Sequence, residues 1–120
     1  MVSVQSEKAA VSMTFHPTNN PFFWQQTAES CFAEEHYMTA SEAYLRLCEL
    51  TPGDASAWAG RGKSLMKLER FPDAVDAFER ALMINPDDAD VLNLLGSAYQ
   101  ALENMDKATA CFVRAGELSL

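Results

Sequence analysis

The chain has 120 residues, 48% of them hydrophobic and 22% charged, a composition typical of one globular domain. Its 17 acidic and 9 basic residues give a net charge of −8, which argues against nucleic-acid binding because phosphate contacts need clustered Lys and Arg. No stretch approaches the roughly 18 to 20 apolar residues that a bilayer-spanning helix needs, so we expect no membrane insertion.

Residues 1–20 contain one modest apolar cluster, Ala9 to Phe15, followed by a polar run. We interpret them as an N-terminal extension, either a disordered tail or a segment that folds back to cap an exposed helix. They lack the basic start and unbroken apolar core of a secretory signal. The three cysteines (Cys31, Cys48 and Cys111) are scattered and odd in number, which favours reduced thiols. We therefore expect a cytoplasmic protein.

The first pair of helices is predicted over residues 21–34 and 38–50. Asn20 followed by Pro21 is typical of a helix start, with Asn as the cap and Pro in the first turn. The second helix should end before Pro52. Thr39 and Glu42 have the spacing of a capping box at the start of that second helix.

The second pair is predicted over residues 55–68 and 72–84, with Asp54 as the cap and Pro72 in the first turn of its second helix. One face of these helices is apolar, formed by Trp58, Leu65, Phe78 and Leu82. Two small residues, Gly62 and Ala74, would let the helices cross closely. We interpret Arg61 as an aliphatic stem packed along its helix with the charge in water.

A third pair is predicted over residues 89–102 and 105–118, with Asp88 as its cap. Moving the central pattern by 34 residues in either direction recovers it. The central positions are Trp58, Gly62, Leu65, Ala74, Phe78, Ala81 and Pro86; the earlier ones are Trp24, Ala28, Ala40, Tyr44 and Pro52; the later ones are Leu92, Leu95, Gly96, Tyr99, Met105, Ala108, Phe112 and Ala115.

This pattern resembles the tetratricopeptide repeat, in three tandem copies over residues 21–54, 55–88 and 89–120. The resemblance implies an all-α fold, a right-handed α-solenoid of three helix-turn-helix repeats.

The sequence offers no persuasive catalytic or metal-binding arrangement. Cys31 and His36 are the nearest nucleophile and base, but five residues apart across a helix end they do not share a face. Asp87, Asp88 and Asp90 form the densest acidic cluster, at a helix start where acidic residues are favoured anyway. We expect no enzyme activity, no metal and no cofactor.

In tetratricopeptide proteins, function resides on the concave face lined by the first helix of each repeat. The resemblance implies that this groove contains Phe22, Gln25, Gln26, Glu29, Phe32 and Ala33, then Ser56, Ala59, Gly60, Lys63, Met66 and Lys67, then Asp90, Asn93, Leu94, Ser97, Gln100 and Ala101. Its predicted apolar anchors are Phe22, Phe32, Met66 and Leu94. The charges of Glu29 and Asp90 would nearly cancel those of Lys63 and Lys67.

Some members of the family bind the C-terminal carboxylate of cytosolic heat-shock chaperones through Lys, Asn and Arg. The matching positions here are Gln25, Glu29, Gly60, Asp90 and Leu94, and all of them depart from that pattern. We therefore predict a protein-interaction module or adaptor that binds a peptide or partner segment in the groove, but not by a carboxylate clamp.

Two alternatives stay open. Bacterial type III secretion chaperones for translocator proteins are also small, acidic, three-repeat proteins. A structural scaffold could instead assemble from copies that stack through their ends. The last helix carries Cys111, Phe112, Ala115, Leu118 and Leu120, an apolar surface that we expect a second copy, the N-terminal segment or a partner to cover.

Overall fold

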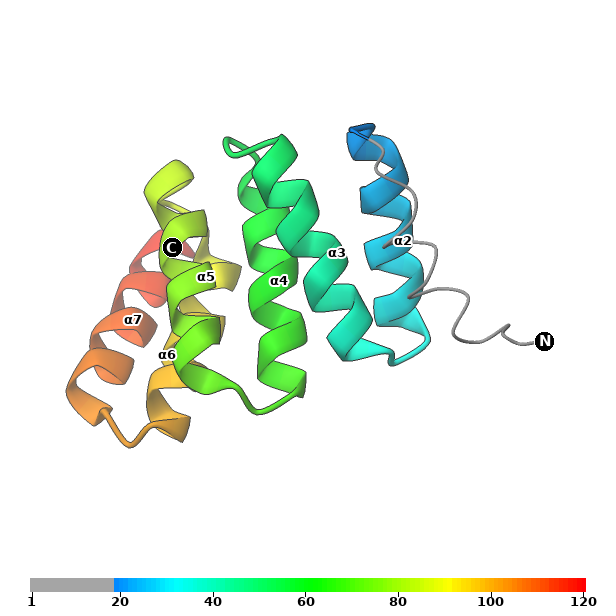
Figure 1. Cartoon of the computed structure of the whole chain (residues 1–120). Helices are drawn as coiled ribbons and strands as arrows, with labels where there is room; N and C mark the ends of the chain where they lie inside the picture. The colour runs from blue at the N-terminus through cyan, green and yellow to red at the C-terminus, as the bar shows by residue number, and fades with distance from the viewer. Residues whose placement is uncertain (1–18) are drawn as a thin grey trace.

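A computed structural model describes residues 19–120, in which six α-helices and no strands occur. The helices are α2 (Pro21–Ala33), α3 (Tyr37–Leu50), α4 (Ala55–Lys67), α5 (Phe71–Ile84), α6 (Ala89–Ala101) and α7 (Met105–Leu118). Each helix packs on the next one along the chain, which produces an elongated stack (Figure 1). The fold is an all-α solenoid, and every helix begins and ends within one residue of its predicted bounds. The predicted N-terminal extension lies outside the described residues, except for its last two.

Side-chain caps define the starts of the first helices. Asn20, Asp54 and Asp88 each accept a hydrogen bond from a backbone N–H in the first turn of the helix that follows, at 3.0, 3.0 and 3.1 Å. These bonds satisfy N–H groups that have no partner within the helix, and the carboxylates also complement the positive helix end. All three predicted caps are confirmed.

The predicted capping box of Thr39 and Glu42 is wrong. The cap position of α3 is His36, whose side chain makes no capping hydrogen bond, and Thr39 is already the third residue of the helix. The tight turn after α2 starts the next helix at Tyr37, two residues before Thr39 could cap it.

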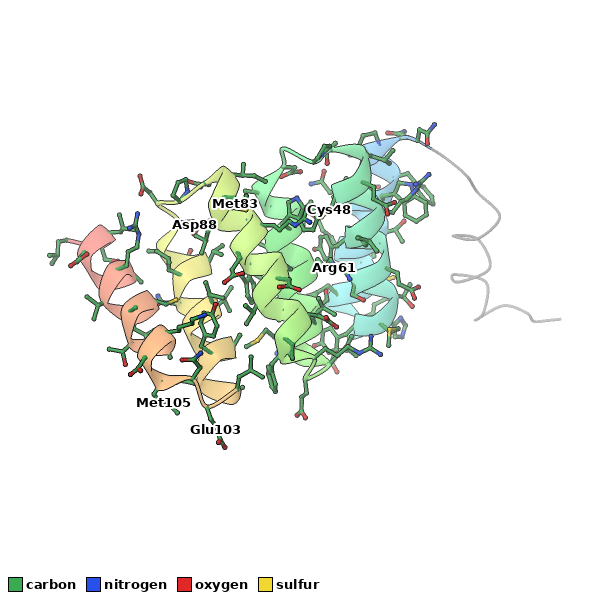
Figure 2. All side chains as sticks on the ribbon, turned by 60° about the vertical axis from the view of Figure 1, so that its left-hand side comes forward. Cys48, Arg61, Met83, Asp88, Glu103 and Met105 are labelled. Atoms are coloured by element: carbon green, nitrogen blue, oxygen red, sulfur yellow. The ribbon has the colours of Figure 1, made fainter. Side chains whose placement is uncertain are left out.

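One turn geometry joins the two helices of every repeat. Glu35, Glu69 and Glu103 have left-handed backbone conformations, with φ of 65°, 59° and 62°. In the second repeat the N–H of Glu69 donates to the Met66 carbonyl, and the N–H of Arg70 donates to the Leu65 carbonyl, both at 2.9 Å. These two bonds define a Schellman motif, in which glycine is the usual left-handed residue. Figure 2 shows Glu103 at such a turn, with its side chain directed away from the helices.

In the second and third repeats, an aromatic ring of the second helix lies against a glycine of the first. A Cβ atom on Gly62 would stand 2.5 Å from Cε1 of Phe78, and one on Gly96 would stand 2.7 Å from Cε1 of Phe112. The helices therefore approach closely at Gly62, as predicted. The residue that this glycine accommodates is Phe78, however, and not Ala74, because the ring extends across the contact.

The first repeat departs from this arrangement. Its ring is Tyr44, which lies against Gly60 of the following repeat, where an added Cβ would collide with the ring. At the position of Gly62 and Gly96 the first repeat has Ala28, which is fully buried and carries a Cβ. Tyr44 thus connects the first repeat to the second.

The interior consists of two apolar clusters, one between α2, α3 and α4 and the other from α4 to α7. Trp58 packs against both clusters, its indole N–H donates to the Pro52 carbonyl at 3.3 Å, and the Arg80 guanidinium lies 4.9 Å from its ring centroid. A single tryptophan therefore links the two halves of the core.

The prediction that Arg61 directs its charge into water is wrong. Its Nη1 donates to the Ser41 carbonyl of α3 at 2.9 Å. Because α3 and α4 pack together, the half-buried guanidinium lies at their contact, where a helical carbonyl can accept a second hydrogen bond. Arg61 thus joins the first and second repeats (Figure 2).

Candidate protein-binding groove

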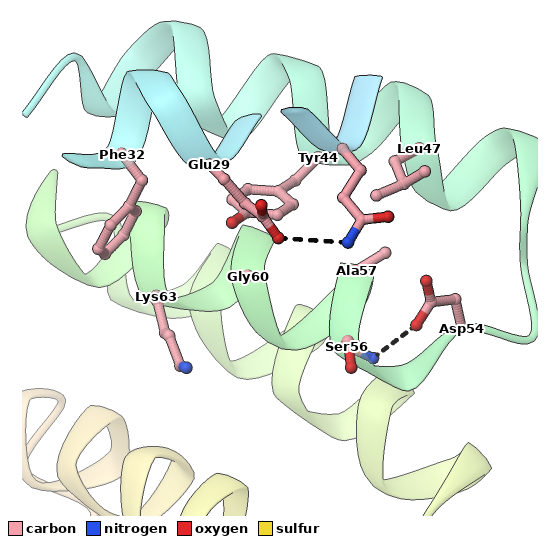
Figure 3. Close-up of a pocket in the computed structure, with 10 residues that line it drawn as sticks. Glu29, Phe32, Tyr44, Leu47, Asp54, Ser56, Ala57, Gly60 and Lys63 are labelled. Atoms are coloured by element: carbon pink, nitrogen blue, oxygen red, sulfur yellow. Dashed lines mark hydrogen bonds between the residues drawn. The ribbon is translucent and has the colours of Figure 1, made fainter. Parts of the chain in front are cut away.

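A cavity of about 260 Å³ opens between α2, α3 and α4 (Figure 3). Six residues of the predicted groove line it: Gln25, Glu29, Phe32, Ser56, Gly60 and Lys63. Four further lining residues were not predicted: Tyr44, Leu47, Asp54 and Ala57. The structure therefore brings the first helices of two repeats together around one space, with α3 forming its floor.

The floor of this cavity is largely apolar. Tyr44 and Leu47 reach it from α3, and Phe32 borders it from α2. Burial raises the pKa of the Tyr44 phenol, and the nearby Glu29 carboxylate raises it further. Tyr44 is consequently neutral at physiological pH, a hydrogen-bond donor beside an apolar surface.

The rim of the same cavity is polar. Gln25 Nε2 donates to Glu29 Oε2 at 3.3 Å, and Asp54 caps α4 through one carboxylate oxygen. Figure 3 shows the Lys63 amine extending away from both carboxylates. Within residues 19–120, neither Glu29 nor Asp54 forms a salt bridge.

A second cavity, of about 210 Å³, adjoins the first between α4 and α6. It shares Ser56 and Lys63 with the first cavity. Its other lining residues are Ala55, Ala59, Asn85, Asp88, Asp90, Val91 and Leu94. The two cavities thus follow one face of the solenoid across all three repeats.

The remaining predicted groove residues line neither cavity. Phe22 is 62% exposed at the start of α2, and Gln26 is also exposed. Met66 is half-buried and packs against the core, and its role as an apolar anchor stays a prediction. The Lys67 amine lies 6.0 Å from the Tyr37 ring centroid. On α6, the Ser97 hydroxyl donates to the Asn93 carbonyl at 3.1 Å.

Comparison with known proteins decides the family. Sequence models of the tetratricopeptide repeat match residues 55–88 and 89–119, which together make up more than half of the chain. The chain belongs to the tetratricopeptide repeat family. A search of curated proteins found no match.

The tetratricopeptide fold is also found in similar solved structures. A structure of MamA (MSR-1) has a TM-score of 0.83 and 23% identity, covering 94% of this chain and 64% of that one. A second MamA structure (AMB-1) has a TM-score of 0.84 at 23% identity, covering 94% of this chain and 61% of that one. The first TPR of Spaghetti (RPAP3), bound to the HSP90 peptide SRMEEVD, has a TM-score of 0.79 and 19% identity, covering 82% of this chain and 78% of that one. The chain therefore spans less than two thirds of these two MamA chains.

The charge of this tetratricopeptide groove differs from the prediction. The residues lining the two cavities include the carboxylates of Glu29, Asp54, Asp88 and Asp90 against the single amine of Lys63. The near-cancellation expected among Glu29, Asp90, Lys63 and Lys67 does not hold for the lining of these two cavities, because the capping aspartates at the starts of α4 and α6 also line them, while Lys67 lies outside. The lining carries a formal net charge of −3.

Cys31 and His36, the nearest nucleophile and base in the sequence, lie near the end of α2 and at the cap of α3. Cys31 is buried, and burial together with the Glu34 carboxylate raises the pKa of its thiol, which disfavours the nucleophilic thiolate. Among residues 19–120, no group of three His, Cys, Asp or Glu side chains could hold a metal ion. Within the same residues, no helix is long and apolar enough to cross a membrane.

The apolar surface of the last helix consists in part of other residues than predicted. Cys111 and Phe112 are half-buried against the core cluster, and Ala115 is buried. α7 packs on α6, and the Phe112 ring lies against Gly96 of α6. The apolar residues that α7 and the chain end leave exposed are Met105, Val113, Leu118 and Leu120.

Proposed function

We propose that this chain is a protein-interaction module that holds an extended segment of a partner protein in its concave groove. The proposal rests on one observation, the pair of adjoining cavities that follow α2, α4 and α6. Both apolar and polar residues line each cavity, the combination by which grooves hold a chain through a few apolar side chains and orient it by hydrogen bonds. The described thiols carry no disulfide, which supports a cytoplasmic location.

A structural relative supports peptide binding as the type of activity, since the RPAP3 structure is described as bound to an HSP90 peptide. At 19% identity that likeness does not transfer the ligand. The carboxylates of Glu29 and Asp90 would repel an acidic tail. We therefore propose a partner other than a carboxylate-terminated chaperone tail.

Obstructing both cavities with one side chain would test this function. Ser56 is exposed and lines both of them, so Ser56→Trp should fill the groove without entering the core. Thr109→Trp also replaces a small hydroxyl residue by tryptophan, at an exposed position of α7, and is the matched control. Partners captured from the source cells should be lost with Ser56→Trp and kept with Thr109→Trp, with circular dichroism unchanged in both. The same partners on all three proteins would refute a groove function.

Self-association is a second candidate, favoured by the exposed apolar side chains of α7 and the chain end. Val113 and Met105 are each 54% exposed, and exposed apolar side chains that lie close together are typical of interaction surfaces. If copies stack through this face, light scattering should show a mass that rises with concentration and falls for Val113→Lys. A constant monomer mass in the parent protein would exclude this function.

A further inference from the structure

We infer that the partner segment is basic and that an arginine side chain enters the cavity between α2, α3 and α4. This inference rests on the proposed groove function and adds the chemical class of the partner. It comes from the placement of charge and aromatic surface around that cavity, and not from the relatives.

Two carboxylates border this cavity. Glu29 reaches the cavity from α2, and Asp54 reaches it from the start of α4, so the carboxylates come from two different helices (Figure 3). Asp54 uses one oxygen to cap the helix, and Glu29 accepts a bond from the Gln25 amide, which is neutral. With Lys63 directed away, an incoming cation would be the first to neutralise either carboxylate.

The floor of the cavity has both aromatic and aliphatic side chains. Phe32 and Tyr44 border the cavity with aromatic rings, and Leu47 adds aliphatic surface. A guanidinium stacks on aromatic rings and binds carboxylates through two parallel hydrogen bonds, whereas an ammonium is a compact, strongly hydrated charge. The Tyr44 hydroxyl makes no hydrogen bond within the described residues. This surface therefore suits arginine better than lysine.

Acidic and apolar side chains also occur together in the second cavity. The adjoining cavity combines Asp88 and Asp90 with the apolar side chains of Val91 and Leu94. Lys63 borders both cavities and would separate two basic side chains of the same segment. A segment with basic residues alternating with apolar ones would thus match both cavities, while an acidic segment would meet repulsion in each.

The probe for this inference is a displayed library of random peptides selected on the whole protein. We expect the selected peptides to be enriched in arginine. One selected peptide is then synthesised with its arginine retained or replaced by lysine or glutamine, and its binding is titrated by fluorescence anisotropy. The expected order of affinity is arginine, then lysine, then glutamine, with binding weaker at high salt because exposed charges are screened.

Variants of the protein identify the site. Glu29→Gln and Asp54→Asn remove charge with little change of shape, and Asn still caps a helix. Each should weaken binding of the arginine peptide by about fivefold, as expected for a partly exposed charge pair. Glu42→Gln, on the exposed surface of α3, is the control and should leave binding unchanged.

The outcomes separate this inference from the function on which it rests. Selected peptides without basic residues that still lose binding to Ser56→Trp would refute the inference and support the groove. Arginine peptides indifferent to Glu29→Gln and Asp54→Asn would also refute it. Selection that fails, or peptides that bind Ser56→Trp as well as the parent, would count against both proposals.

Discussion

Replacing Gly62 by alanine should destabilise the protein, although alanine is the better helix former. In a helix interior that exchange favours alanine by about 1 kcal/mol. Here the added Cβ would stand 2.5, 2.7 and 2.8 Å from three atoms of the Phe78 ring. Phe78 has no exposed surface, so its ring can move only by displacing other core side chains. Forcing extra volume into such a site costs about 1–3 kcal/mol.

The net effect is therefore a loss of about 1 kcal/mol in the free energy of unfolding, which for a domain of this size lowers Tm by about 4–8 °C. Gly96→Ala should cost less, since its Cβ would stand 2.7 Å from a Phe112 ring that is only half-buried. Gly116→Ala is the control: nothing lies within 4 Å of its Cβ on α7, so it should stabilise by about 0.5 kcal/mol near the helix end.

Urea and thermal unfolding followed by circular dichroism would measure these differences. A double-mutant cycle adds a direct test, because Phe78→Leu shortens the ring that conflicts with the new Cβ. Its cost should be smaller in the Gly62→Ala background than in the parent. If Gly62→Ala is as stable as Gly116→Ala, or if the cycle shows no coupling, the Phe78 ring does not pack on Gly62 as described.

Three further predictions concern single residues. Glu69→Gly should stabilise by about 0.5–1 kcal/mol in urea because its φ of 59° suits glycine, and a loss of stability would contradict this. Asp54→Ala should lower the free energy of unfolding by about 1 kcal/mol, and Asp54→Asn should lower it much less. Equal urea midpoints for the two variants would contradict the capping role of Asp54. Burial raises the pKa of the Cys48 thiol from 9.0 to about 12. The folded chain then keeps a proton that the unfolded chain loses, so stability should fall as pH rises above about 9, and less steeply in Cys48→Ala; identical slopes would refute the shift.

The helices could be predicted from sequence because their ends depend on local chemistry. Asn20, Asp54 and Asp88 satisfy backbone N–H groups within their own first turns, and no distant contact is needed for that. The left-handed turns could not be predicted in the same way. Glutamate has no local preference for positive φ, so Glu69 adopts it only because the two helices on either side must pack together.

The groove was predicted in part. Glu29 and Lys63 were expected from their positions on the first helices, and both line the first cavity. Tyr44 was missed because it occupies the same repeat position as Phe78, which packs within its own repeat. Its direction depends on two small residues in different repeats, Ala28 and Gly60. The glycine was the available signal, since the equivalent positions hold larger side chains, Gln26 and Leu94.

The contact between the Tyr44 ring and Gly60 affects how the first repeat opens. In a linear array each repeat is held by its neighbours, so a repeat opens more readily when a contact with a neighbour is lost. The ring that holds the first repeat to Gly60 also forms part of the cavity floor. Opening of α2 and α3 would dismantle the cavity, so any ligand seated there must oppose that opening. Amide hydrogen exchange in α2 and α3 would then slow on binding, and the first repeat would be ordered most firmly when the groove is occupied.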